Sequence, residues 1–238
     1  MILDNIKKQI PNLFTLGNLS CGVFAIILIF QNEPEKAAYL IIFAAILDFF
    51  DGFLARLLGV SGELGKQLDS LADCVTFGVA PGIMLYYFSN TTAFVGPYEY
   101  FRYAFILLPT LSAYRLAKFN IDTRQSESFI GVPTPITGLM VASFALISGS
   151  LGSFVFDSIF EYPIIFLFFC AIISFLLISE LPLVSLKIKK DKPMKTYSVQ
   201  IGIAIIGLAS ILLFQWLALP IIYVVYVLSS VFLNFAKK

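Results

Sequence analysis

Four aspartates stand at spacings that could bring their carboxylates together. Asp48 and Asp51 are three residues apart, and Asp69 and Asp73 are four residues apart. Residues at these separations share one face of an α-helix. A short turn joins the two segments, so a helical hairpin would bring both faces into one small volume. Carboxylate oxygens are hard ligands that suit Mg²⁺, Mn²⁺ or Ca²⁺, and four carboxylates are enough to bridge two such ions.

The residues between the aspartates leave room for a ligand that bears phosphate. Gly52 and Gly65 place no side chain beside the acidic face, and Ala55 adds only a methyl group. Arg56 keeps its charge and suits a phosphate or a carboxylate. Two metal ions about 4 Å apart can clamp the attacking and leaving oxygens of a displacement at phosphorus. We therefore predict a diphosphate site at a membrane surface; the alternative is a structural ion-pair network at a helix end.

The chain that positions these residues has the composition of an integral membrane protein. It is 59% hydrophobic and 13% charged over 238 residues, with a mean hydropathy of +0.90. The net charge of +1 and the lack of a basic stripe give no indication of nucleic-acid binding. There is no histidine, and the three cysteines form no CxxC pair. Histidine-dependent nucleophilic triads are thereby excluded, and a zinc or redox site is not indicated.

Hydropathy and turn signals predict an all-α membrane protein with about eight transmembrane helices. A short amphipathic helix, in which Ile2, Ile6 and Ile10 recur beside Lys7 and Lys8, is expected to precede them. We find no internal repeat and no separate soluble domain, so residues 1–238 are expected to form one membrane-embedded domain. The eight predicted spans are roughly 13–30, 37–58, 66–88, 100–120, 134–150, 163–182, 197–216 and 219–235.

The distribution of basic residues predicts the orientation of these spans. With the N-terminus inside, 14 of the 16 lysines and arginines fall in inner segments, and only Lys36 and Arg102 fall outside. Cytoplasmic segments of membrane proteins carry such an excess of basic residues. We therefore expect both termini, and the ends of the spans that carry the aspartates, to be cytoplasmic. The cytoplasmic (inner) membrane is the expected location, with the active site on the cytoplasmic side.

The spacing DxxDGxxARx8GxxxDxxxD resembles the signature of the CDP-alcohol phosphatidyltransferases. Every fixed position of that signature is present between residues 48 and 73, and the surrounding apolar spans fit the all-helical membrane fold of that family. The resemblance implies an enzyme that moves a phosphatidyl group from a CDP-linked lipid to an alcohol and releases CMP. It also implies two divalent cations, Mg²⁺ or Mn²⁺, and a homodimer.

The resemblance also implies a role for each matching residue. Asp48, Asp51 and Asp69 would bind the metal pair, and Asp73 would complete the metal site and act as general base. The positions that match the family's cytidine and diphosphate contacts are Gly52, Ala55, Arg56 and Gly65. Thr15 and Asn18, near the inner end of the first span, are further candidates for contact with the nucleotide.

Three other stretches resemble the phosphatidylserine synthase branch of this family. They are IPNLFTLGNLSCG at 10–22, SAYRLAKFN at 112–120 and FIGVPTP at 129–135. This resemblance implies CDP-diacylglycerol and L-serine as substrates. Arg115, Lys118 and Asn120 would then lie at the inner end of the fourth span, where they could meet the serine carboxylate. Each of these features also has a structural alternative. Arg115, Lys118 and Arg124 could serve only to orient the protein in the membrane by their positive charge. Asn120 could cap its helix, and GVPTP could form a rigid turn.

Two other functions remain open at this point. One is the same transfer to another alcohol, chiefly glycerol 3-phosphate, as in phosphatidylglycerophosphate synthase; such an enzyme also needs cations near its acceptor. The other is a cation-coupled membrane transporter, since carboxylates inside membranes often mark ion pathways. Against a transporter, the aspartates gather at one end of their spans, and the last four spans contain almost no ionisable residues.

Overall fold

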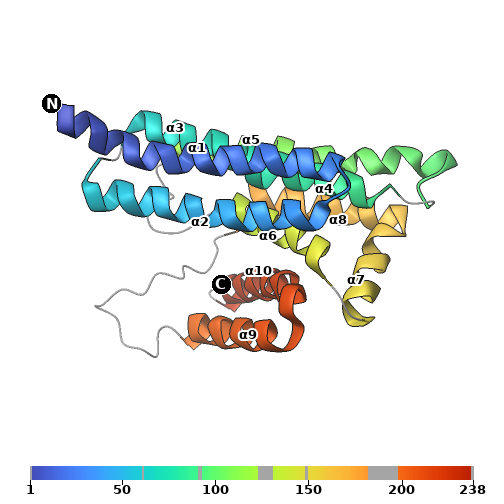
Figure 1. Ribbon diagram of the computed structural model, residues 1–238. Helices are drawn as coiled ribbons and strands as arrows, with labels where there is room; N and C mark the ends of the chain where they lie inside the picture. The colour runs from blue at the N-terminus through green and yellow to red at the C-terminus, as the bar shows by residue number, and fades with distance from the viewer. Residues whose placement is uncertain are drawn as a thin grey trace.

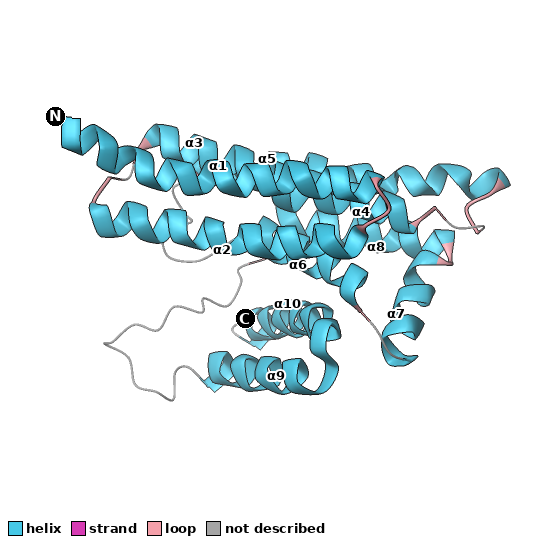
Figure 2. Cartoon of the chain, viewed as in Figure 1, coloured by secondary structure: helices cyan, strands magenta, loops and turns pink. Residues whose placement is uncertain are grey.

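The described part of the chain is entirely helical. The structure is a computed structural model, and it describes residues 2–60, 62–90, 93–122, 131–147, 150–181 and 198–236. Only helices and the turns between them are found in these ranges (Figure 2). The expected basic segment 187–195, Arg124, Lys237 and Lys238 lie outside the described residues.

The first three long helical segments hold the signature and the helix beside it. α1 (Ile2–Phe30) packs along the length of α2 (Pro34–Leu58) in Figure 1. Small side chains such as Ala25, Ala37 and Ala44 are fully buried in the core to which both helices contribute; small residues let helix backbones approach closely in membrane proteins. The third segment runs without a break through α3 (Glu63–Asp73), a π-helical stretch η1 (Cys74–Val79) and α4 (Ala80–Phe88).

The remaining helices follow the predicted order with two differences. A 3₁₀-helix η2 (Gly96–Ile106) leads into α5 (Leu107–Ile121), and α8 (Pro163–Ile178) lies where the sixth span was expected. The predicted span 134–150 instead ends early: α6 (Thr134–Ser143) and η4 (Phe144–Leu146) stop before Ile147, whose backbone is extended. A separate helix that the sequence did not predict, α7 (Ser150–Phe160), follows at an angle of 114° to the preceding helical run.

The C-terminal helices form a packed pair. α9 (Ser198–Phe214) and α10 (Ala218–Ala236) contact each other across η6 (Gln215–Leu217), where Gln215 has a φ of 49° (Figure 1). This turn lies at the boundary between the last two predicted spans, 197–216 and 219–235.

The helices are those of a membrane protein, although the expected count of eight spans is not confirmed. Four described segments are long and apolar enough to cross a membrane, namely 9–30, 34–58, 63–88 and 205–233, and a fifth is possible if the bent pair at 134–160 is one span. The expected amphipathic helix is not confirmed as a separate element, because residues 2–30 form one helix that includes Pro11.

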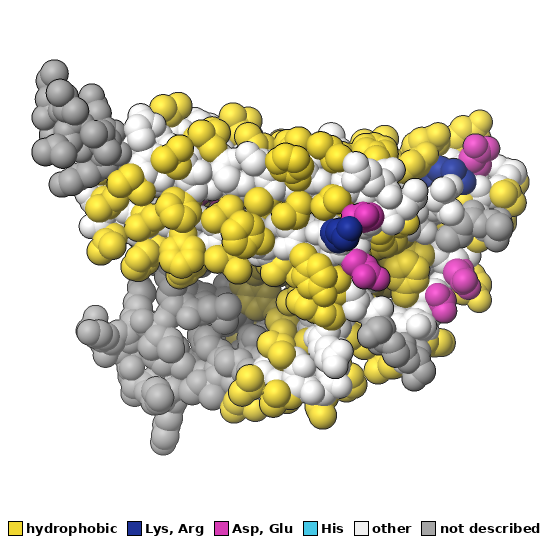
Figure 3. All heavy atoms as spheres, viewed as in Figure 1, with side chains coloured by type: hydrophobic (Ala, Val, Ile, Leu, Met, Phe, Trp, Pro, Cys, Tyr) yellow, Lys and Arg dark blue, Asp and Glu magenta, His cyan; other side chains and the backbone are white. Residues whose placement is uncertain are grey.

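Apolar side chains cover the outside of the helices. Phe24, Phe43 and Phe49 have exposed fractions of 60%, 50% and 64%. In Figure 3, hydrophobic side chains spread over α1 and α2, and few charged groups interrupt them. Monomeric soluble proteins rarely expose apolar patches of this extent, so this surface suits contact with lipid.

Candidate metal and nucleotide site

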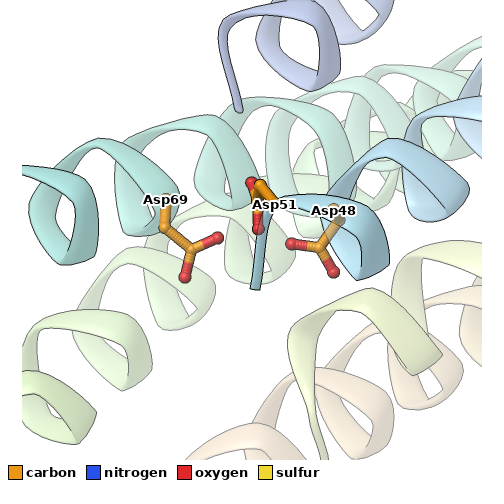
Figure 4. A group of neighbouring side chains, drawn as sticks. All are labelled: Asp48, Asp51 and Asp69. Atoms are coloured by element: carbon orange, nitrogen blue, oxygen red, sulfur yellow. The ribbon is translucent and has the colours of Figure 1, made fainter. Parts of the chain in front are cut away.

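Three of the four aspartates meet where α2 and α3 approach each other. One carboxylate oxygen from each of Asp48, Asp51 and Asp69 lies within 4.8 Å of the other two. Figure 4 shows Asp48 and Asp51 on one helix and Asp69 on the other, with the three carboxylates turned toward a common space. The predicted convergence of the two acidic helix faces is therefore found in the fold.

The fourth aspartate reaches the same group through Asp48. The side chain of Asp48 interacts with those of both Asp69 and Asp73. Asp73 ends α3, and only 7% of it is exposed, whereas Asp69 one turn earlier is half-buried. The four carboxylates thus extend from a partly open edge at Asp69 to a buried end at Asp73.

The turn between α2 and α3 sets this geometry. Gly59 ends α2 with a φ of 64°, a left-handed conformation that favours glycine. The backbone N–H groups of Gly59 and Val60 donate to the carbonyls of Arg56 and Ala55, which satisfies two carbonyls at the helix end. The chain reverses here, so that α3 runs back beside α1.

Two side chains of α1 donate hydrogen bonds to two of the carboxylates. Thr15 Oγ1 donates to Asp51 Oδ2 at 2.7 Å, and Asn18 Nδ2 donates to Asp73 Oδ1 at 3.3 Å. Thr15 and Asn18 are 3% and 0% exposed. They are three residues apart, so one face of α1 contacts both α2 and α3 through these bonds.

A close contact between α1 and the π-helical stretch keeps Asn18 in place. Thr76 Oγ1 donates to the backbone carbonyl of Asn18 at 3.0 Å. A Cβ atom at Gly22, one turn further along α1, would lie 2.4 Å from Thr76 Oγ1 and 2.8 Å from Thr76 Cα. Only glycine fits at position 22, and its absence of a side chain lets the two helices approach closely.

A cavity of about 690 Å³ opens beside the acidic group. Arg56 lies next to Gly52: a Cβ atom at Gly52 would be 3.3 Å from Arg56 Nη1. The cavity is therefore lined by a guanidinium group, by carboxylates and by backbone that carries no side chain at the glycines. Its lining includes seven of the predicted site residues (Thr15, Asp51, Gly52, Ala55, Arg56, Gly65 and Asp69) and others such as Gln9, Asn12 and Lys66.

The charges of this region suit hard cations. Among the described residues, the guanidinium groups that interact with the carboxylates are Arg56 with Asp51 and Arg115 with Asp73. Four carboxylates with two guanidinium groups leave a formal excess of negative charge, and the three grouped aspartates offer only oxygen atoms as ligands. Oxygen donors of this kind fit Mg²⁺ or Mn²⁺ rather than zinc or copper. Asp48, Asp51 and Asp69 could hold such an ion.

The three residues predicted to contact the acceptor have different surroundings. Arg115 is buried, with 7% exposed, and its Nη1 donates to Thr134 Oγ1 at 3.4 Å. Lys118 instead lies 3.4 Å from Glu180 in an ion pair. Asn120 donates to Ser70 Oγ at 2.9 Å and joins α5 to α3. Arg115 therefore interacts electrostatically with Asp73, while the contacts of Lys118 and Asn120 are with other groups.

Several polar residues near the site were not singled out from the sequence. Gln9 and Asn12 line the cavity, and Thr134 is fully buried beside Arg115. Asn12 lies three residues before Thr15, so helical spacing could have placed it on the same face. Thr134 lies within the GVPTP stretch, where the turn itself was the preferred interpretation.

Comparison with known proteins identifies the family of this chain. Residues 8–176 match the model of the CDP-alcohol phosphatidyltransferase family. A CDP-diacylglycerol–serine O-phosphatidyltransferase of Bacillus subtilis (strain 168) is 38% identical over 140 residues, which are 58% of this chain and 76% of that protein. The protein of the same name from Mycobacterium leprae (strain TN) is 33% identical over 215 residues, 86% of this chain and 65% of that protein.

A third relative with that name, from Helicobacter pylori (strain J99 / ATCC 700824), is 37% identical over 142 residues, 58% of this chain and 57% of that protein. The matches thus span just under two thirds of the M. leprae protein and just over half of the H. pylori protein. The family match covers the acidic group, the cavity and the helix that holds them, and the chain belongs to the CDP-alcohol phosphatidyltransferase family.

Proposed function

We propose that this protein transfers the phosphatidyl group of CDP-diacylglycerol to the hydroxyl of L-serine, giving phosphatidylserine and CMP. The observation that carries the proposal is the meeting of Asp48, Asp51 and Asp69 beside a cavity that also contains Arg56. The names of the relatives favour serine over glycerol 3-phosphate as the acceptor. No observation favours the transporter.

Asp48, Asp51, Asp69 and Asp73 would hold two divalent cations, Mg²⁺ or Mn²⁺. When bound, these ions would supply positive charge to the diphosphate and to the oxygens of the displacement. Two features of the protein support this proposal. The grouped ligand atoms are all oxygens, and hydrogen bonds orient Asp51 and Asp73.

The cavity is the proposed site for the cytidine diphosphate. Arg56 offers a planar donor group for phosphate oxygens, and Gly52, Ala55 and Gly65 leave space for the nucleotide to approach the backbone. Thr15 lines the same cavity and remains a candidate for contact with the nucleotide. Asn18, the other candidate on α1, has its amide on Asp73. The exposed apolar faces of α1 and α2 suit the acyl chains of the donor.

Asp73 is the proposed general base for the acceptor. It takes the proton from the serine hydroxyl as that oxygen forms a bond to the phosphatidyl phosphorus. The bond from phosphorus to the oxygen of CMP breaks, and CMP leaves with the electron pair. Arg115, which interacts with Asp73 and contacts Thr134, would receive the serine carboxylate. Lys118 and Asn120 have other partners, so we base the acceptor site on Arg115.

We further propose that the enzyme lies in the inner membrane with this site on the cytoplasmic side. The acidic group lies near the turn between α2 and α3, and Arg56 and Lys66 flank that turn. Basic residues of this kind mark cytoplasmic ends. Serine and the lipid donor are both within reach there. A homodimer is expected from the family resemblance.

An acceptor panel tests the function. Purified protein in detergent, with CDP-diacylglycerol and Mg²⁺ or Mn²⁺, is offered serine, glycerol 3-phosphate, inositol phosphate or no alcohol, and CMP release is followed. Release that depends on serine supports the proposal. Release with a different alcohol would keep the reaction and refute the acceptor. No release with any alcohol from folded protein would refute transfer and favour an ion site.

A further inference from the structure

Only the nitrogen of the Asn18 side-chain amide has a hydrogen-bond partner among the described residues. Its Nδ2 donates to Asp73 Oδ1 at 3.3 Å, but its Oδ1 is buried and has no hydrogen-bond partner. A carboxylate can only accept hydrogen bonds, so the amide must turn its NH₂ group toward Asp73, and the orientation of the oxygen follows. Buried polar atoms are nearly always paired. An unpaired acceptor beside the proposed general base therefore indicates a missing donor.

The donor that fits best is the ammonium group of the acceptor. The diphosphate of the lipid donor offers oxygens and no N–H groups, and the amino and hydroxyl donors of its cytidine belong to the nucleotide, whose proposed cavity is lined by Thr15 but not by Asn18. Serine carries three N–H donors on the carbon next to the one that bears its hydroxyl. Glycerol 3-phosphate has no ammonium group. A receptor for that group must lie close to the base, because the hydroxyl and ammonium of serine are only about 3 Å apart.

The geometry of Asn18 meets this requirement. The oxygen and nitrogen of an amide are about 2.2 Å apart, which places Oδ1 at most about 5.5 Å from the Asp73 oxygen that Nδ2 contacts at 3.3 Å. Hydroxyl donors lie about 2.7 Å from a carboxylate oxygen, and N–H donors about 2.9 Å from a carbonyl oxygen. A single serine molecule can thus span Asp73 and Asn18 with its hydroxyl and ammonium groups.

The contacts of α1 position the backbone that carries this amide. Thr76 holds the Asn18 backbone carbonyl, and the Gly22 contact with Thr76 fixes the distance between α1 and η1. Arg115 also interacts electrostatically with Asp73, and its buried Nε has no hydrogen-bond partner in the described part of the chain. Asp73 thus interacts with one group that suits an ammonium and one that suits a carboxylate, the two charges of an α-amino acid.

From this arrangement we infer that Asn18 determines specificity for the acceptor: its NH₂ group orients Asp73, and its carbonyl oxygen receives the ammonium of serine. The inference rests on the proposed function and extends it to the choice of acceptor. It also gives Asn18 a role different from the nucleotide contact that the sequence suggested.

The test compares serine with 3-hydroxypropionate, which keeps the hydroxyl and carboxylate but lacks the amino group. We expect wild-type kcat/KM to be about 10- to 100-fold higher for serine, the range for a hydrogen bond to a charged group. In Asn18→Leu, which removes both ends of the amide at similar volume, the ratio should fall to within about threefold of unity. Both acceptors should also lose turnover, because Asp73 loses its donor.

The matched control is Ser20→Ala on the exposed face of the same helix, where the hydroxyl bonds only to the Leu16 carbonyl. It should keep the wild-type ratio. Asn18→Ala is the second variant, for use if leucine prevents folding. Binding of radiolabelled serine to protein saturated with Mn²⁺ and CMP gives a readout without turnover, and it should weaken about tenfold or more in either Asn18 variant.

A wild-type enzyme that uses both acceptors equally, or an Asn18 variant that keeps the wild-type ratio, would overturn the inference while leaving serine transfer intact. A wild-type enzyme that releases CMP only with some other alcohol would overturn the proposed function, and the inference with it.

Discussion

Replacing Thr15 by valine should weaken metal binding without altering the fold. Valine has nearly the same shape but cannot donate a hydrogen bond. In the structure, the Thr15 hydroxyl lies 2.7 Å from Asp51 Oδ2 and 3.1 Å from the Pro11 carbonyl. Both Thr15 and Asp51 are buried, at 3% and 6% exposed. Water is therefore poorly placed to replace the lost donor.

The size of the effect follows from this burial. Hydrogen bonds to charged groups contribute about 1.5–3 kcal/mol, and each ~1.4 kcal/mol changes an equilibrium constant tenfold. Partners that orient metal-ligating side chains typically change metal affinity by about 10- to 100-fold when they are removed. We therefore expect the Kd for Mn²⁺ to rise about 10- to 100-fold in Thr15→Val.

Titration with Mn²⁺, followed by the electron paramagnetic resonance signal of the free ion, measures this change. Ser20→Ala provides the control, since it removes a hydroxyl from the same helix that bonds only to a backbone carbonyl. Unchanged Mn²⁺ affinity in folded Thr15→Val, or an equal loss in Ser20→Ala, would show that the hydroxyl does not orient a metal ligand.

Three further predictions concern the base, the acceptor site and the fold. Asp73→Asn should lower turnover by about 10²- to 10⁴-fold while CDP-lipid binding stays largely intact; turnover near wild type would remove Asp73 from the role of base. Arg115→Ala should raise the KM for serine about tenfold and that for the lipid by much less, and equal effects on both would make Arg115 structural. Gly131→Ala should lower the thermal midpoint more than Gly59→Ala, by at least several degrees. Both glycines have positive φ, at 75° and 64°, but only at Gly131 would a Cβ meet a backbone oxygen, Leu177 O at 2.3 Å; equal shifts would contradict the close contact.

The local pattern around the signature predicted the arrangement of the aspartates. Asp48 and Asp51 share a helix face because they are three residues apart, and the glycine that ends α2 lies in a short turn that brings α3 back. Both features depend on neighbours in the chain, so periodicity and turn chemistry were sufficient. The same reasoning failed for the predicted span 134–150. The apolar run carries no strong turn signal at Ile147, where the helix ends, and α7 then follows as a separate helix.

The contacts of α1 could not be predicted in this way. Thr15 and Asn18 were expected at the nucleotide, yet each donates to a carboxylate, 36 and 55 residues further along the chain. Arg115, Lys118 and Asn120 looked alike as polar residues at one helix end, yet Arg115 interacts electrostatically with Asp73, whereas Lys118 pairs with Glu180 and Asn120 bonds to Ser70. A side chain's partner across helices depends on how the helices rotate and approach, which residue spacing within one helix does not specify.

The sequence by itself determined the membrane class, the helical segments around the signature and the oxygen-rich chemistry of the four aspartates, because composition and spacing act locally. The tertiary structure alone decided which groups surround each aspartate. The approach of α1 at Gly22, the buried amide of Asn18 and the placement of Arg115 beside Asp73 all arise from packing between distant segments. The physical reason is that hydrogen bonds and burial at the site depend on distances of a few ångströms between helices, and those distances are set only when the whole bundle has packed.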